Sequence, residues 1–185
     1  MRKVLIIGSA GAGKSTFAAE LGAALGLPVV HLDALYWQPG WRKPPREEWT
    51  ERVAELLTRD RWVMDGNYGG TLAARVRAAD TVILLALPRL QCVYRVVRRG
   101  VLGWGRSRAD LNPGCTEQLP DWSFLRWVWS YPDAELPTVL ALLRDHGAGK
   151  RIEILRSSAE VRGFLATIWA SAGPASVDHL PSAAT

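Results

Sequence analysis

The sequence predicts an α/β domain: a five-stranded parallel sheet covered by helices on both faces. Three observations lead to this fold class. Five short apolar runs alternate with segments whose apolar residues recur at helical spacing. The first run is apolar at consecutive positions, as in strands buried on both faces. That run opens into a glycine-rich loop and then a helix, the arrangement of a phosphate-binding unit.

The five predicted strands are the apolar runs at residues 3–7, 28–32, 61–65, 81–87 and 151–155. Helices are predicted where apolar residues recur three or four positions apart. They run from the glycine loop to Gly26, around 49–57, from Arg89 to Arg99, and at 121–130, 134–146 and 157–170.

Two segments, 33–45 and 100–120, lack this periodicity. Residues 33–45 are expected to form a loop. We expect residues 100–120 to form a lid, because the segment contains four glycines. Residues 1–170 then make up a single domain, and residues 171–185, which are small and polar, form a disordered tail.

The composition fits one globular domain that handles phosphate. The chain has 185 residues, 48% of them hydrophobic, and a net charge of +5. Its 23 basic residues include only four lysines, and arginine matches phosphate oxygens with its planar fork. Surplus positive charge also fits nucleic acid. Two cysteines do not make a disulfide framework, and no apolar run is long enough to span a membrane, so we expect a cytoplasmic protein.

Residues 8–15 match the motif G-x-x-x-x-G-K-[ST] in full and Thr16 follows; residues 8–16 are called the phosphate loop below. Glycines let the backbone turn its N–H groups around phosphate, and the following helix adds its positive end. Lys14 is expected to reach the β- and γ-phosphates, and Ser15 to bind Mg²⁺. The predicted ATP-binding residues are therefore Gly8, Ser9, Ala10, Gly11, Ala12, Gly13, Lys14, Ser15 and Thr16.

Asp65 ends the third predicted strand, in the stretch Trp62–Asp65. Ligands of parallel sheets bind at the carboxyl ends of the strands, so Asp65 is placed to hold Mg²⁺ beside Ser15. The alternative is a turn aspartate, since Asp-Gly-Asn is also good turn chemistry.

The helix after the fourth strand carries Arg95, Arg98 and Arg99 on one stripe. Such arginines become favourable when an anion lies across them, and in phosphoryl transfer they neutralise charge on the moving group. The alternative is a solvated basic face. The apolar contacts of this helix are expected from Leu90, Val93, Tyr94 and Val97.

These motifs resemble those of the adenylate kinase type of nucleoside-monophosphate kinases. The resemblance rests on the phosphate loop, "MDGN" and "LPRLQCVYRVVRR", and it implies a P-loop NTPase fold that uses ATP and Mg²⁺. It also implies that Arg95 and Arg99 form the Arg-x-x-x-Arg pair that closes on the transferring group. Residues 2–165 more closely resemble the DNA topology modulation protein family, through "GSAGAGKST", "HLDALYWQPGW", "DGNYGGT", "DLNPGC" and "WSYP".

One departure concerns the acceptor. Adenylate kinases follow the third-strand aspartate with Gly-Phe-Pro-Arg, whose arginine grips the acceptor phosphate, whereas this chain continues as Gly66-Asn67-Tyr68. Arg42 and Arg46 could replace that arginine from the other side of the cleft, and Asn67 is a candidate acceptor contact. A nucleoside-monophosphate kinase is therefore one alternative.

Asp33, predicted to end the second strand, favours a hydroxyl acceptor. A carboxylate near the γ-phosphate can take the proton of an attacking hydroxyl. The stretch resembles uridine kinase-like and nicotinamide-riboside kinase-like enzymes, in which the strand-two aspartate is the base. The alternative for Asp33 is a capping hydrogen bond. Trp37 and Trp41 follow in the loop and could stack on an acceptor ring or simply pack in the core.

The sequence thus predicts a Mg²⁺-dependent kinase that passes the γ-phosphoryl group of ATP to a small acceptor. The predicted catalytic residues are Lys14, Asp33, Arg95 and Arg99, and Arg156 is expected near the adenine. A second alternative is a nucleotide-dependent DNA-topology or regulatory protein. Its support is the positive charge, but the sequence contains no nucleic-acid-binding signature.

Overall fold

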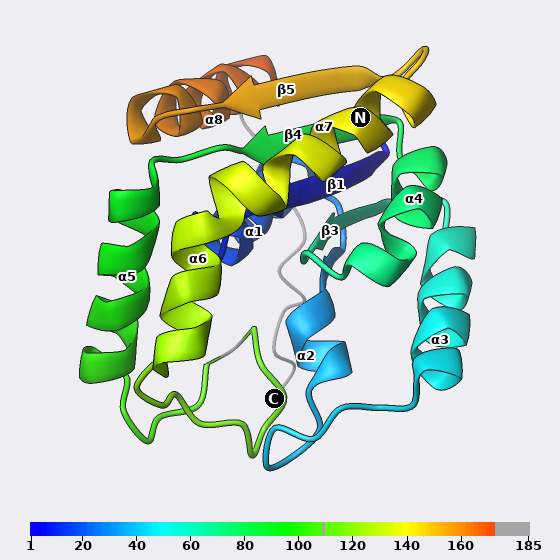
Figure 1. Ribbon diagram of the computed structural model, residues 1–185. Coiled ribbons are helices and arrows are strands. Elements are labelled where there is room, and N and C mark those ends of the chain that lie inside the picture. The colour runs from blue at the N-terminus through cyan, green and yellow to red at the C-terminus, as the bar shows by residue number, and fades with distance from the viewer. Residues whose placement is uncertain (109, 173–185) are drawn as a thin grey trace, which may run out of the picture.

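The computed structural model describes residues 1–108 and 110–172 (Figure 1). Its five strands form one parallel sheet in the order β2-β3-β1-β4-β5. The prediction of a five-stranded parallel sheet is therefore confirmed. Residues 173–185 of the expected disordered tail lie outside the described residues. The strands are β1 (Lys3–Gly8), β2 (Val29–His31), β3 (Trp62–Asp65), β4 (Thr81–Leu85) and β5 (Arg151–Leu155).

Six of the helices lie where the sequence predicts them, and α2 and α4 do not. Helix α2 is a single turn inside the segment expected to be a loop. Helix α4 begins with Gly69 and Gly70, two poor helix formers, so its propensity gives a weak signal. The helices are α1 (Lys14–Leu25), α2 (Leu32–Tyr36), α3 (Arg46–Thr58), α4 (Gly69–Ala78), α5 (Arg89–Leu102), α6 (Trp122–Ala134), α7 (Leu136–His146) and α8 (Ser158–Ala172).

The sheet is buried on both faces, as the continuous apolar runs predict. Alternate residues of β1 point to opposite sides. Val4 and Ile6 join a core with α1, α5, α6 and α8, while Leu5 and Ile7 join a second core with α3, α4 and α7. None of the described helices has the length and apolar composition that crossing a bilayer requires.

Helix α5 buries a different stripe from the one expected. Leu90, Tyr94 and Val97 were predicted to make apolar contacts, but they are 68%, 65% and 37% exposed. The helix instead buries smaller residues, which allow a closer approach of its neighbours. A Cβ on Gly100 would lie 2.7 Å from the ring of Pro120. The buried stripe consists of Cys92, Val96 and Gly100.

The segment between α5 and α6 is irregular, as expected, and its action as a lid remains a prediction. Helix α5 runs on to Leu102, so the irregular part begins at residue 103 rather than 100. We call residues 103–121 the lid segment. Its described part contacts the loop after α2: the Trp41 indole N–H donates to Thr116 O at 3.1 Å, and Gly40 N–H donates to Gly114 O at 3.2 Å.

Candidate active site

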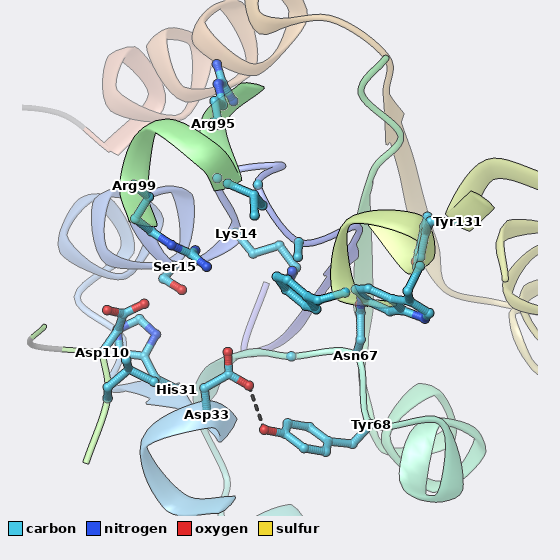
Figure 2. A pocket seen from close by; sticks show the side chains of 18 of the residues that line it. Lys14, Ser15, His31, Asp33, Asn67, Tyr68, Arg95, Arg99, Asp110 and Tyr131 are labelled. Atoms are coloured by element: carbon cyan, nitrogen blue, oxygen red, sulfur yellow. Dashed lines mark hydrogen bonds between the residues drawn. The ribbon is translucent and has the colours of Figure 1, made fainter. Parts of the chain in front are cut away.

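The carboxyl ends of β1, β2 and β3 open into a cavity of about 1170 Å³. The phosphate loop, α2, the turn after β3, α5, the lid segment, α6 and α7 all contribute to its lining. Figure 2 shows the side chains of Lys14, Ser15, Asp33 and Arg99 around one space. The edge of the sheet at which the sequence places ligands is therefore also where the structure has its cavity.

The phosphate loop has the backbone geometry that its glycines permit. Gly11 and Gly13 adopt φ angles of 78° and 88°, which L side chains rarely adopt. A Cβ on Gly11 would also collide with the carbonyl oxygen of Cys92. The Lys14 ammonium donates to Ser9 O at 3.0 Å, so the lysine lies along the loop itself. Burial lowers the pKa of Lys14, while the charges of Asp33 and Asp65 act to raise it.

The predicted metal ligands lie at this edge of the sheet. Ser15 lines the cavity, and Asp65 is buried at the end of β3, beside β1. One Asp65 oxygen accepts a hydrogen bond of 2.8 Å from Nδ1 of His31, which also lines the cavity. This bond raises the pKa of His31, because it stabilises the imidazolium.

Two arginines of α5 and the lid segment share a buried carboxylate. Glu117 Oε1 lies 3.2 Å from Arg99 Nε and 2.8 Å from Arg108 Nε. None of the three atoms has a hydrogen-bond partner, so the contacts are ion pairs without hydrogen-bond geometry. Burial and the neighbouring Arg108 lower the pKa of Arg99. An anion bound here would accept hydrogen bonds from the Nε–H groups of Arg99 and Arg108 and would reduce the repulsion between the two guanidinium groups.

This chemistry fits a triphosphate with Mg²⁺. The phosphate loop supplies Lys14 and backbone N–H groups, and Arg99 and Arg108 supply buried Nε–H donors without hydrogen-bond partners. Ser15 and Asp65 supply the oxygen ligands that Mg²⁺ prefers. The Ser9 hydroxyl is a further buried group without a hydrogen-bond partner.

The three arginines predicted to share one stripe of α5 do not all face the cavity. Arg95 and Arg99 line the cavity, whereas Arg98 is exposed and absent from the lining. The Arg95 guanidinium donates to the Ser158 hydroxyl of α8 at 3.1 Å and to Ala12 O of the phosphate loop at 3.5 Å.

Asp33 faces the phosphate loop across the cavity. Strand β2 ends at His31, so Asp33 lies in the first turn of α2 and not on the strand. The Tyr68 hydroxyl donates to Asp33 Oδ1 at 2.6 Å (Figure 2). Burial and the Asp33 charge raise the pKa of Tyr68 well above its ordinary value, so it stays a donor. Sequence reasoning missed Tyr68, although it follows the "DGN" turn directly.

The turn that carries Tyr68 is held by a buried arginine. Arg75 of α4 is 0% exposed and has no ion-pair partner among the described residues. It donates to Gly66 O at 2.8 Å, Tyr68 O at 2.6 Å and the Thr71 hydroxyl at 3.2 Å. Burial lowers its pKa to about 10. Between Gly66 and Tyr68, the Asn67 side chain accepts from Gly8 N–H at 3.3 Å, which joins this turn to the phosphate loop.

Aromatic side chains form much of the remaining lining. Trp37 and Trp41 come from the loop after α2, and their rings meet edge to face with centroids 5.3 Å apart. Trp41 has a φ of 60°, a strained angle for a residue with a side chain. From α6 come three further rings that the sequence analysis did not assign to the site: Phe124, Trp127 and Tyr131.

Three predicted arginine contacts lie outside the cavity, and buried Asp65, which is bound to His31, is not part of the lining either. Arg42 and Arg46 are exposed, and neither belongs to the lining. Arg156, expected near the adenine, is also exposed and outside the lining; its backbone N–H donates to Glu160. The structure thus brings together Lys14, Ser15, Asp33, Arg95 and Arg99, but not these three arginines.

No family model matches the chain, and no curated protein sequence matches it. Membership of the DNA topology modulation protein family therefore remains a prediction.

Solved structures match over most of the chain. A shikimate kinase from Acinetobacter baumannii in complex with shikimate is 18% identical, with 91% of this chain and 90% of that chain covered and a TM-score of 0.54. A gluconokinase from Sinorhizobium meliloti 1021 is 16% identical, with 92% and 91% covered and a TM-score of 0.51. These likenesses show the fold, which is that of P-loop kinases. The predicted adenylate kinase-like P-loop fold is confirmed.

Proposed function

We propose that the protein is a Mg²⁺-dependent kinase that transfers the γ-phosphoryl group of ATP to a hydroxyl group of a small molecule. The observation that carries this proposal is the position of Asp33. Its carboxylate lies in the same cavity as Lys14, and Tyr68 binds one of its oxygens, which leaves the other for an acceptor.

In the proposed reaction the phosphate loop and Lys14 hold the triphosphate. Arg99 and Arg108 stabilise charge on the transferring group. The acceptor oxygen bonds to the γ-phosphorus as the bond to the β–γ bridging oxygen breaks. The hydroxyl proton passes to Asp33, and ADP leaves. Bound Mg²⁺, held by Ser15 and Asp65, would neutralise charge on the β- and γ-phosphates.

The arginines of the site favour a hydroxyl over a phosphate as acceptor. A monophosphate acceptor needs arginines on the Asp33 side, and the two candidates, Arg42 and Arg46, do not line the cavity. A hydroxyl acceptor needs a base, and Asp33 is available.

A screen for ADP formation across hydroxyl compounds and monophosphates tests the proposal. We expect turnover with at least one hydroxyl compound, abolished in Lys14→Ala and reduced about 10²- to 10⁴-fold in Asp33→Asn. Arg42→Ala serves as a control because Arg42 lies outside the cavity. Turnover only with monophosphates, or loss of activity in Arg42→Ala, would contradict the hydroxyl assignment.

A further inference from the structure

The lysines and arginines that line the described part of the cavity all come from the phosphate loop, α5 and the lid segment, which we call its phosphate end. Each contacts the phosphate loop or the lid segment: Lys14 binds Ser9 O, Arg95 binds Ala12 O, and the other two pair with Glu117. The lining from α2, α4, α6 and α7 contributes no lysine or arginine. The four cations are Lys14, Arg95, Arg99 and Arg108.

The nearby cationic side chains outside this set are not positioned to bind a ligand in the cavity. Arg75 lies behind the turn after β3, is fully buried, and already uses three of its donors on that turn and on Thr71. The Lys43 ammonium lies 5.7 Å from the centre of the Trp37 ring and does not line the cavity. His31, which does line it, is bound to Asp65.

The acceptor side, around Asp33, is instead acidic and aromatic. Asp33 is bound there by Tyr68, and Trp37 and Trp41 line the same cavity. An anionic group of an acceptor bound here would lose hydrating water and lie near the Asp33 carboxylate without a cation to pair with. Both effects are unfavourable. Figure 2 shows the phosphate-end residues Lys14, Ser15 and Arg99 on one side, with Asp33 and Tyr68 on another.

The aromatic rings of α6 give the cavity flat surfaces. Phe124 and Trp127 are stacked, with centroids 5.8 Å apart and an interplanar angle of 16°. Trp127 meets Tyr131 edge to face at 5.7 Å. Rings and bases bind to such faces regardless of their hydrogen-bonding pattern.

We propose that the acceptor site takes an uncharged, ring-bearing hydroxyl compound of the nucleoside type and excludes acceptors that carry phosphate or carboxylate. This inference rests on the proposed function, because only a kinase has an acceptor. Its prediction about binding, however, can be tested without catalysis. The shikimate and gluconate types of acceptor, which are carboxylates, fall in the excluded class.

The charge part is tested by calorimetry on the protein saturated with Mg²⁺ and a non-hydrolysable ATP analogue. The analogue fills the phosphate loop, so an added monophosphate cannot bind there. The probes are adenosine, cytidine and thymidine, their 5′-monophosphates, shikimate and gluconate. We expect at least one nucleoside to bind at least about tenfold more tightly than its monophosphate and both carboxylates. Equal or tighter binding of a monophosphate or carboxylate overturns the proposal, as does the absence of nucleoside binding.

The aromatic part is tested by a matched pair on α6. Trp127→Leu should weaken nucleoside binding about 5- to 150-fold, the range for losing one stacked base. Trp129→Leu should leave binding unchanged, since Trp129 is exposed, lies outside the lining and faces Arg89. Equal effects of the two substitutions would refute the stacking assignment.

The acidic part is tested by reversing one charge. Glu135, at the junction of α6 and α7, also lines the cavity, and Glu135→Lys should reduce the ratio of nucleoside to monophosphate affinity at least about fivefold. The control is Asp145→Lys, which changes the net charge by the same amount. Asp145 is an exposed residue of α7 outside the cavity lining, so this substitution should leave the affinity ratio unchanged. An unchanged affinity ratio in Glu135→Lys counts against the exclusion of anionic acceptors by charge. If nucleosides bind as expected but no ADP forms, the proposed function fails and this inference stands.

Discussion

Replacing Arg75 by methionine should destabilise the fold and disable the acceptor side together. The substitution keeps a long side chain but removes three hydrogen bonds of a buried cation. Tyr68 O would keep a donor, because the Thr71 hydroxyl also donates to it at 3.2 Å. Gly66 O would keep none that the described residues supply.

These contacts set the size of the effect. One orphaned buried carbonyl costs about 1–3 kcal/mol, and the other lost bonds bring the total to about 2–4 kcal/mol. For a chain of this length that corresponds to a fall in Tm of about 4–15 °C. Urea unfolding measures the change.

The control is Arg77→Met on the same helix. Arg77 is exposed, so its replacement should change the unfolding free energy by less than about 0.5 kcal/mol. At temperatures where Arg75→Met is folded, acceptor turnover should fall more than ATP affinity, because the displaced turn carries Tyr68. An Arg75→Met protein as stable as wild type would refute the reasoning.

Four further outcomes are expected. Lys14→Ala should lower ATP affinity sharply in calorimetry without changing the melting temperature much; unchanged binding would contradict the phosphate-loop assignment. Asp33→Asn should bind ATP almost normally but turn over slowly, and near wild-type turnover would remove Asp33 as the base. Hydrogen exchange in the lid segment (103–121) should slow when Mg²⁺ and a non-hydrolysable ATP analogue are added, and equal exchange would argue against closure. The pKa of Asp80 lies below its ordinary 3.8 although burial raises it, because Thr81 and two backbone N–H groups donate to its carboxylate. Since the folded pKa is depressed, the stability lost in Asp80→Ala should be largest near neutral pH and shrink as pH falls below 3.8; a pH-independent difference would contradict this.

The parts of the fold that the sequence predicts well are those fixed by local pattern. The apolar runs of the strands and the strand–loop–helix unit around Lys14 each carry their own signal within a few residues. Helix α4 does not, because its first turn contains two glycines. Arg75 of this helix binds the turn that precedes it, and these contacts become apparent only in three dimensions.

The site was harder to predict for the same reason. Asp33 and Arg99 could be proposed from their places after β2 and in α5. Tyr68 and Glu117 could not, because their roles depend on contacts with residues 35 and 18 positions away. Charge alone also does not locate a residue: Arg42 and Arg156 look suited to phosphate in the sequence, yet neither lines the cavity.

Phosphorus NMR of a reaction with ATP, Mg²⁺ and a nucleoside mixture tests the central claim most directly, because it identifies the bond that forms. The account predicts that the γ-phosphate signal of ATP is replaced by that of a phosphomonoester, with ADP in equal amount, and that neither appears with Lys14→Ala. If the nucleosides give no product but a parallel mixture of nucleoside monophosphates gives a second diphosphate beside ADP, the acceptor is a phosphate and the hydroxyl assignment is wrong. Inorganic phosphate alone, formed at the same rate with and without the nucleosides, would contradict the claim that this protein is a kinase acting on a hydroxyl group.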